Sequence, residues 1–193
     1  MKSEAAPWIV TRVDGKIASV STDWRYFART AGRVSELPPD SVSEVGAARI
    51  STPALMDLSL HTRWEDLRLF GSAFQIKVWR QLYLLTHRSD GTPRPAEDGV
   101  KLLSYSQLAK LCDNLSGVRA VAHAVACNPV SVILPCHLIV PKSSIDRILS
   151  IRTRAQSTLF KGADLYLLDS IDVGEYAWGS DLKRRLIALQ LHR

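Results

Sequence analysis

The segment Val132–Val140 constrains this chain more than any other part of its sequence. It reads Val-Ile-Leu-Pro-Cys-His-Leu-Ile-Val, so a stretch suited to a buried core carries a thiol and an imidazole side by side at Cys136 and His137. An imidazole can withdraw the proton of a thiol, directly or through one water, and thereby create a thiolate nucleophile. Neighbouring side chains on an extended chain point to opposite faces, so the pair can meet only at a turn, which Pro135 favours.

These two residues also have an ordinary interpretation. Cys136 could be a small buried hydrophobic residue and His137 a hydrogen-bonded core histidine, which is the commoner situation for an arbitrary Cys-His pair. We adopt that interpretation for the other two cysteines, since Cys112 lies on the apolar stripe of an expected helix and Cys127 lies at a helix end with no base beside it in sequence. The surrounding motifs must decide the role of Cys136.

Composition limits the class of protein. The 193 residues are 46% hydrophobic, enough for one main domain, with or without a smaller attachment, to bury a core. No apolar run is long enough to cross a bilayer and no secretion signal is recognisable. The 3 cysteines form no Cys-x-x-Cys pair, which indicates a reducing intracellular compartment without a structural metal. The net charge of +6 favours an anionic partner such as nucleic acid.

The patterning divides the chain into two parts and predicts an α+β fold. Residues 1–70 are expected to form a small sheet-containing unit with a structural role, because strand-like alternation occurs at Trp8–Val13 and Ile17–Ser21. Residues 71–193 are expected to form a mostly helical domain with a helix-turn-helix and a buried active-site segment. Within that domain, the stretch at about 143–174 has little pattern, and we interpret it as an insertion.

Helix signals become clear in the second part. Apolar residues recur at helical spacing from Phe74 to Leu85, and Ser104 and Ser116 are the expected N-caps of two further helices. Asn128-Pro129 ends the last of these helices. The two later helices are joined by a short turn, which is the arrangement of a helix-turn-helix.

Two later segments complete the expected architecture. Val130–Pro135 is rich in β-branched residues and fits a buried strand or extended segment that ends at Cys136. The last helix, Ser180–Leu191, is expected to place three leucines inward, with Gln190 beside that edge. These leucines are Leu182, Leu186 and Leu189.

The second helix of the expected helix-turn-helix has an unusual outer face. Its core stripe consists of valines, whereas the opposite side carries one arginine among mostly small residues. Such a face allows close approach to a nucleic-acid groove, although alanines present for helix propensity would give the same pattern. The residues of this face are Arg119, Ala122, His123 and Ala126.

Five motifs occur along the chain in a characteristic order. They are Phe74-Gln75 with Val78-Trp79 and Leu82; Ser104-Tyr105 with Leu108-Ala109; Arg119-Ala120-Val121 with Ala124; Asn128-Pro129 running into Leu134-Pro135-Cys136-His137; and Tyr176-Ala177-Trp178-Gly179 followed by Lys183-Arg184. Together they resemble the O6-alkylguanine-DNA alkyltransferase family, also called methylated-DNA–protein-cysteine methyltransferases. The Pro-Cys-His core after an Asn-Pro step is the most specific part of this resemblance.

The resemblance implies direct reversal of DNA damage by a single-turnover methyltransferase. The thiolate of Cys136 would accept the alkyl group from guanine O6 in double-stranded DNA and keep it. His137 would be the water-mediated base, Asn128 the hinge between the DNA-binding helix and the active-site segment, and Gln190 would stand where the family orients that histidine. No cofactor or metal is implied, and we expect a monomer without membrane contact, in the cytoplasm of a bacterium or the nucleus of a eukaryote.

The resemblance also implies which residues contact DNA. The damaged base is stacked inside a duplex and must be flipped out, at a cost of about a few kcal/mol. Tyr105 would push against the target phosphate, and Arg119 would fill the gap in the stack. Ser104 and Ala122 complete the implied DNA-binding set. The groups implied to hold the flipped base are the backbone at Cys136 and Ile139 and the loop around Tyr176 and Ala177.

Two residues depart from the family's pattern. Leu138 stands where the family usually has an arginine, and Gln190 stands where it usually has a glutamate beside the histidine. An amide can accept a hydrogen bond but cannot stabilise an imidazolium by charge, so we predict a less activated thiol and slower transfer. Trp178 resembles the tryptophan of many microbial members rather than the glycine of mammalian ones, and we predict that its bulk crowds out benzylated guanine.

Three other functions remain open from the sequence. The departures at Leu138 and Gln190 could leave a module that binds alkylated DNA with weak or no transfer, although Cys136 is retained. The helix pair could instead belong to a helix-turn-helix regulator, but no dimerisation stripe is visible. A hydrolase that uses Cys136 and His137 is the weakest alternative, because no Asp or Asn with supporting spacing would orient the histidine.

Overall fold

The structure, a computed structural model, describes residues 8–38, 44–98, 101–157 and 168–191. For residues 152–157 it describes the backbone alone. One part of the expected insertion, 158–167, lies outside the described residues. Within the described ranges, no helix combines the length and the apolar character needed to cross a bilayer.

The N-terminal part contains a three-stranded antiparallel sheet with the strand order β2-β1-β3. Its strands are β1 (Trp8–Val13), β2 (Lys16–Ser21) and β3 (Val45–Ile50). Asp14 and Gly15 join the first two strands with φ angles of 50° and 75°, the left-handed geometry of a tight hairpin turn. The two strands predicted from alternation are confirmed, whereas β3 escapes prediction because Val-Gly-Ala-Ala-Arg-Ile shows no alternation.

Two helices accompany the sheet. The first, α1 (Trp24–Ser35), packs against β1 and β2. Asp23 caps it by accepting a hydrogen bond from the backbone N–H of Arg25 at 2.8 Å. The second, α2 (Thr52–His61), begins after the N-cap Ser51. Both starts are therefore encoded by short polar side chains just before the helix.

Three helices follow, and the last two of them form the predicted helix-turn-helix. They are α3 (Ala73–Tyr83), α4 (Tyr105–Leu111) and α5 (Val118–Ala126), and α4 and α5 pack against each other and against α3. Ser104 caps α4 as predicted, in a capping box with Gln107. The prediction that Ser116 caps α5 is wrong, because that helix begins one residue later, after Gly117, without a side-chain cap.

After α5 the chain turns tightly, so the buried strand predicted over Val130–Pro135 is wrong. Val132 has a φ of 74°, and the N–H of Leu134 donates to the carbonyl of Val130 at 3.0 Å. A short 3-10 helix, η4 (Cys136–Leu138), follows. The apolar composition does indicate burial, but a compact turn buries these side chains as well as a strand would.

The sheet is joined directly to this turn. The N–H of Val20 in β2 donates to the carbonyl of Pro129 at 2.8 Å, and the N–H of Ser131 donates to the carbonyl of Val20 at 3.3 Å. One hydrophobic cluster runs through both parts of the chain and includes the fully buried Trp8 and Trp79. The sheet and the helices thus share one core.

Further helices follow in the C-terminal part. A 3-10 turn, η5 (Lys142–Ser144), and α6 (Ile145–Ser157) give regular structure to the first part of the expected insertion, and α8 (Ser180–Leu191) follows later. The prediction that Leu189 points inward is wrong, because it is 45% exposed. The buried face of α8 contains two polar side chains, so the spacing of apolar residues alone predicts the wrong face to be buried. Its residues are Lys183, Leu186, Ile187, Gln190 and Leu191.

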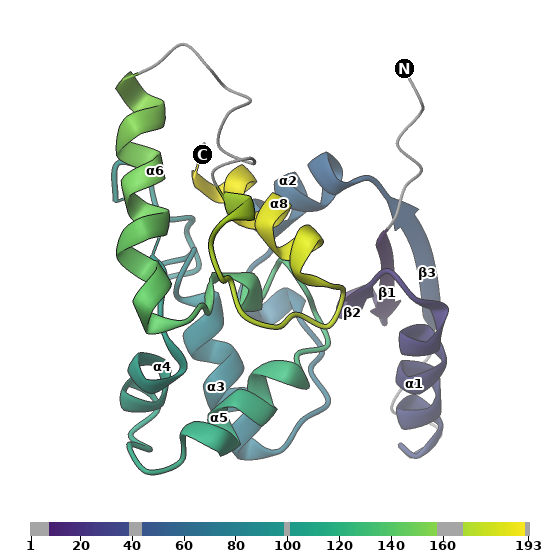
Figure 1. Ribbon diagram of the computed structural model, residues 1–193. Helices are drawn as coiled ribbons and strands as arrows, with labels where there is room; N and C mark the ends of the chain where they lie inside the picture. The colour runs from purple at the N-terminus through teal and green to yellow at the C-terminus, as the bar shows by residue number, and fades with distance from the viewer. Residues whose placement is uncertain (1–7, 39–43, 99–100, 158–167, 192–193) are drawn as a thin grey trace.

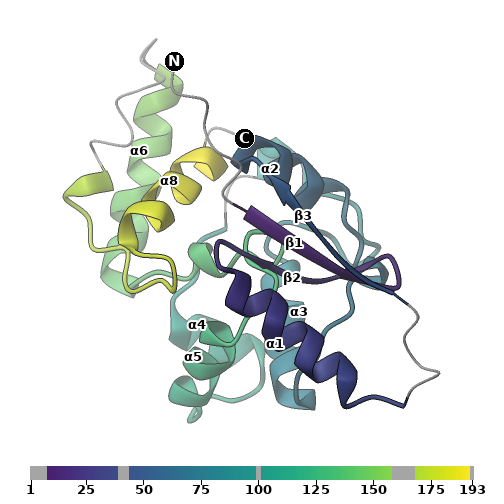
Figure 2. The same cartoon turned by 90° about the vertical axis from the view of Figure 1, so that its right-hand side faces the viewer.

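The arrangement of these elements leaves the cysteine turn at the centre. The sheet and α1 lie at one end of the molecule and α6 at the other, with α8 between them (Figure 1). Two further 3-10 helices, η2 (Trp64–Asp66) and η3 (Ala96–Asp98), lie in the connections around α3. Both views place α1 and α5 toward the same lower end of the molecule (Figure 2).

Candidate active site

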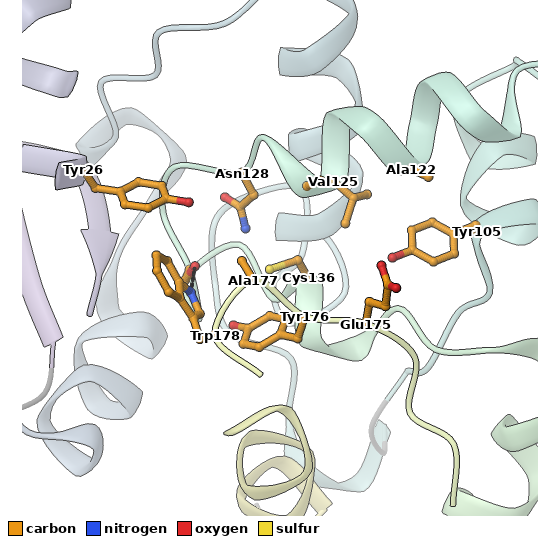
Figure 3. Close-up of a pocket in the computed structure, with 12 residues that line it drawn as sticks. Tyr26, Tyr105, Ala122, Val125, Asn128, Cys136, Glu175, Tyr176, Ala177 and Trp178 are labelled. Atoms are coloured by element: carbon orange, nitrogen blue, oxygen red, sulfur yellow. Dashed lines mark hydrogen bonds between the residues drawn. The ribbon is translucent and has the colours of Figure 1, made fainter. Parts of the chain in front are cut away.

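Cys136 faces a cavity of about 500 Å³. The residue is 8% exposed and begins η4, so a turn rather than a strand presents its thiol. Figure 3 shows its side chain between α5 and Tyr176. The cavity is lined from α1, α4, α5, the turn after α5 and the segment before α8 by Tyr26, Tyr105, Ala122, Val125, Ala126, Asn128, Ser131, Cys136, Glu175, Tyr176, Ala177 and Trp178.

Asn128 connects the end of α5 to the turn that carries the thiol. Its side-chain amide donates to the carbonyl of Leu134 at 2.8 Å, and its carbonyl oxygen accepts from the N–H of Val130 at 3.0 Å. Asn128 is 6% exposed, so both bonds are shielded from water. A movement of α5 is therefore transmitted to the segment next to Cys136.

The surroundings of Cys136 keep its thiol protonated at rest. Burial raises the pKa of Cys136, while the polar side chain of Asn128, the positive charge of Lys183 and the hydroxyl of Tyr176 act in the opposite direction. The burial effect is the largest. The polar neighbours are therefore placed to support a thiolate once a reaction forms it.

Lys183 is a site residue that sequence reasoning leaves without a role. It is 1% exposed on α8, and its ammonium group donates to the carbonyls of Ile139 at 2.8 Å and Glu175 at 3.2 Å. Burial lowers its pKa to about 8, and the negative charge of Cys136 acts against that shift. Lys183 thus fixes the chain after η4 to the segment before Tyr176. Its spacing to Leu186 and Gln190 on one helix face is the signal that could have found it.

His137 and Gln190 lie behind the cavity rather than on its lining. They are 0% and 3% exposed, and the helix α8 that carries Gln190 packs against η4. Leu138 is also buried, and its carbonyl accepts from the N–H of Leu103 at 3.1 Å. Backbone pairing and apolar packing therefore anchor the turn at the position where the family usually has an arginine.

The residues expected to contact DNA divide into two groups. Tyr105 and Ala122 line the cavity, and burial raises the pKa of Tyr105. Arg119 is exposed on α5 outside the lining. Ser104 is 4% exposed and its hydroxyl belongs to the cap of α4, so a DNA contact from that hydroxyl would require the cap to open.

The residues expected to hold a base are also in two places. Tyr176 and Ala177 line the cavity, whereas Ile139 is buried and offers its carbonyl to Lys183. Burial raises the pKa of Tyr176 well above its usual value, so its phenol stays protonated. The wall on this side can therefore donate a hydrogen bond.

The N-terminal unit supplies one wall of the cavity, which the expectation of a purely structural unit did not foresee. The Tyr26 ring of α1 lies 4.9 Å from the Trp178 ring, measured between centroids. The indole N–H of Trp178 donates to the hydroxyl of Ser131 at 3.1 Å. Trp178 is thus held from both sides (Figure 3).

Cys127 has a different environment from the one expected. It is exposed, and its sulfur lies 3.6 Å from the imidazole Nε2 of His123. The expectation that no base lies near Cys127 is wrong, because residues four apart are neighbours on a helix surface. Within the described ranges, no three Cys, His, Asp or Glu side chains are grouped as metal ligands would be.

The fold and the site define a class: an α+β protein in which the end of a helix-turn-helix is hydrogen-bonded to the turn that presents a buried cysteine. Residues 99–155 match the family model described as 6-O-methylguanine DNA methyltransferase, DNA binding domain. Over this segment, the chain is similar to the methylated-DNA–protein-cysteine methyltransferase family.

Curated relatives of this chain carry the same family name. A probable methylated-DNA–protein-cysteine methyltransferase of Acanthamoeba polyphaga mimivirus is 37% identical over 79 residues, which are 41% of this chain and 45% of that protein. The methylated-DNA–protein-cysteine methyltransferase of Haemophilus influenzae is 39% identical over 72 residues, 37% of this chain and 34% of that protein. The similarity thus spans less than half the length of these relatives.

A solved structure supports the fold over nearly the whole chain. The crystal structure of Mycobacterium tuberculosis O6-methylguanine methyltransferase superimposes with a TM-score of 0.50 at 17% sequence identity, and covers 96% of this chain and 94% of that one. The predicted α+β class, with a small sheet followed by a mostly helical part, is confirmed.

Proposed function

We propose that this protein repairs DNA by moving an alkyl group from O6 of guanine to the sulfur of Cys136. The main observation in support is the position of this thiol at a cavity of about 500 Å³, next to the second helix of a helix-turn-helix. Ligand sites for small molecules have volumes of about 300–1,000 Å³, so a single flipped base is of suitable size. The net charge of +6 fits a DNA partner.

The reaction needs a thiolate, a leaving group and one proton transfer. The thiol of Cys136 loses its proton to His137, directly or through one water, and the sulfur then attacks the alkyl carbon. The carbon–O6 bond breaks, and its electron pair stays on the guanine. His137 then gives up the proton, which the guanine accepts as it is restored. Because the new sulfur–carbon bond is a stable thioether, each protein molecule reacts once.

Several neighbours would prepare this step. Lys183 and Asn128 favour the thiolate against the effect of burial. Gln190 would orient His137 with an amide rather than a carboxylate, so the imidazolium receives no charge support and transfer is slow. The carbonyl of Ile139 and the walls at Tyr176 and Ala177 would hold the flipped guanine.

Binding would use the outer face of α5. Small side chains such as Ala122 allow this helix to approach the minor groove closely, and Arg119 would take the place of the flipped base in the stack. Tyr105, at the edge of the cavity, would press on the phosphate of that nucleotide. We further propose that the protein acts as a monomer, in the cytoplasm of a bacterium or the nucleus of a eukaryote.

Intact mass after incubation with duplex DNA containing O6-methylguanine tests the proposal. We expect the protein to gain one methyl group in place of a proton, and Cys136→Ala to gain nothing. Cys127→Ala is the matched control and should still be methylated, because that thiol lies outside the cavity. Methylation that persists in Cys136→Ala, or its absence from the wild type, contradicts the proposal.

A second candidate function follows from Gln190 and the raised pKa of Cys136. If the thiol is too poorly activated, the protein binds alkylated DNA without accepting the group. Tight, salt-sensitive binding to lesion DNA with no gain in mass would favour this function over transfer.

A further inference from the structure

Helix α1 carries a row of arginines that the proposed site does not use. Arg25, Arg29 and Arg33 are spaced four residues apart, so they lie along one side of the helix over about 12 Å. The sequence of α1 contains no Asp or Glu. This helix therefore presents a row of exposed arginine side chains to solvent.

Two of these arginines line a groove of about 190 Å³ between α1 and the end of α5. Arg29 and Arg33 lie on the α1 side, and Ala126 and Cys127 lie on the α5 side. The groove shares Tyr26 and Ala126 with the Cys136 cavity, so the two hollows adjoin each other. A DNA strand that leaves the cavity along the end of α5 meets this groove.

The charges in the groove favour an anion. None of its lining residues is acidic. The carbonyl end of α5 alone would repel a phosphate, since a helix C-terminus carries partial negative charge, and the two guanidinium groups reverse that sign. Arg29 is held over the Tyr26 ring at 5.4 Å, and Arg33 donates to the carbonyl of Phe70 at 2.6 Å. Both side chains are thus held in place, and among the described residues neither forms a salt bridge with a carboxylate.

We propose that Arg29 and Arg33 form a second DNA-binding surface, which holds backbone phosphates of the strand next to the flipped nucleotide. The guanidinium group suits this partner, because it binds phosphate oxygens through paired donors. The identity of the partner rests on the proposed function. In this arrangement the N-terminal unit enlarges the footprint on DNA beyond the helix-turn-helix.

Arg25 provides a matched control on the same helix. It is paired with Asp23 and is absent from the groove lining. Its charge is therefore already neutralised, and removing it should not affect a phosphate in the groove. Arg25→Ala changes the same residue type at the same helical spacing, which separates a specific contact from a general loss of positive charge.

The salt dependence of binding to an unmodified DNA duplex tests the proposal. Each neutralised phosphate contributes about 0.9 to the slope of log K against log salt concentration. We expect the double variant Arg29→Ala/Arg33→Ala to lose about 1.8 of this slope, Arg29→Ala alone about half of that, and Arg25→Ala nothing. The pair Arg29→Lys/Arg33→Lys keeps the charges and should keep the slope. Thermal unfolding measurements test whether each variant is folded. If loss of the bond from Arg33 to the carbonyl of Phe70 destabilises the double variant, Arg29→Ala alone still tests the proposal.

The outcomes separate this surface from the repair reaction. The proposal is overturned if Arg29→Ala and the double variant both show the same salt-dependence slope as the wild type. It is also overturned if the wild-type protein does not bind duplex DNA. A wild type that binds with the expected slopes but accepts no methyl group refutes only the transfer. The rate of methylation by the free base O6-methylguanine provides a further check. The double variant should react with the free base at the wild-type rate and should react more slowly than the wild type only with methylated duplex DNA.

Discussion

Replacing Lys183 with methionine removes both the charge of this side chain and its hydrogen bonds. Lys183 is 1% exposed, and burial lowers its pKa from 10.5 to about 8. A shift of that size corresponds to about 3 kcal/mol of disfavoured ionisation in the folded protein. Methionine is of similar length and uncharged, so Lys183→Met removes this cost.

The same substitution takes a donor from two carbonyls. Ile139 and Glu175 accept from Lys183 at 2.8 Å and 3.2 Å, and each carbonyl left without a partner costs about 1–3 kcal/mol. The gain and the loss are of similar size, so we expect the free energy of unfolding at neutral pH to change by no more than about 3 kcal/mol.

The pH dependence of stability identifies the charge contribution. The folded pKa of Lys183 lies below its unfolded value, so between pH 8 and 10.5 the unfolded state binds the additional proton. This group therefore makes the wild type more stable as pH rises through that window. Lys183→Met lacks this contribution, and denaturant unfolding at several pH values measures the difference.

Reactivity should change more than stability. The positive charge of Lys183 lowers the pKa of Cys136 against the effect of burial. Without it the thiolate is rarer, so Lys183→Met should transfer a methyl group more slowly, and iodoacetamide should alkylate Cys136 only at higher pH. Arg185→Met, at an exposed position on the same helix, is the control and should match the wild type. A folded Lys183→Met variant with the wild-type alkylation profile refutes this electrostatic reasoning.

Three further predictions concern the walls and supports of the site. Trp178→Gly and Tyr26→Ala should both be inactivated faster by O6-benzylguanine, because each removes part of a ring contact that narrows the cavity; equal rates in wild type and variants contradict this. Gln190→Glu should speed single-turnover transfer by giving His137 charge support, and a rate at or below that of the wild type argues against that role. Asn128→Ala leaves the partners of two buried bonds unsatisfied and should lower the free energy of unfolding by about 2–6 kcal/mol, measured by urea titration; a loss below about 1 kcal/mol would show that the bonds are replaced.

Local signals in the sequence predict much of the fold. The cap at Ser104 and the strands of the first hairpin depend on neighbouring residues, so a short window is sufficient to find them. The first part of the insertion, by contrast, is the helix α6, which its weak apolar pattern does not reveal. The strength of a local pattern thus decides what can be predicted.

The turn before Cys136 depends on contacts that are distant in sequence. Val130–Pro135 has the composition of a strand, but Val132 adopts a positive φ where Asn128 bonds to Leu134. A side-chain hydrogen bond that closes a turn outweighs β propensity, and the pattern of apolar residues does not reveal such a bond.

The residues of the candidate site can be predicted where they belong to a sequence motif. They cannot be predicted where only the packing of distant elements brings them to the cavity. Cys136 and Tyr105 belong to motifs, and both face the cavity. Tyr26 lies in a unit with no catalytic spacing and reaches the cavity only because α1 packs on the sheet. Lys183 belongs to a motif, but only burial gives it an electrostatic role.

The bonds of Val20 to Pro129 and Ser131 have a consequence for the order of folding. They join segments that leave the ribosome far apart in time, and contacts between distant segments form late because their loops must close first. Tyr26 and the last helix are likewise separated by most of the chain. We therefore expect the thiol of Cys136 to be accessible to oxidants and electrophiles during synthesis, until the first and last segments meet. In the folded protein, the walls of the cavity shield the sulfur of Cys136 from such reactions.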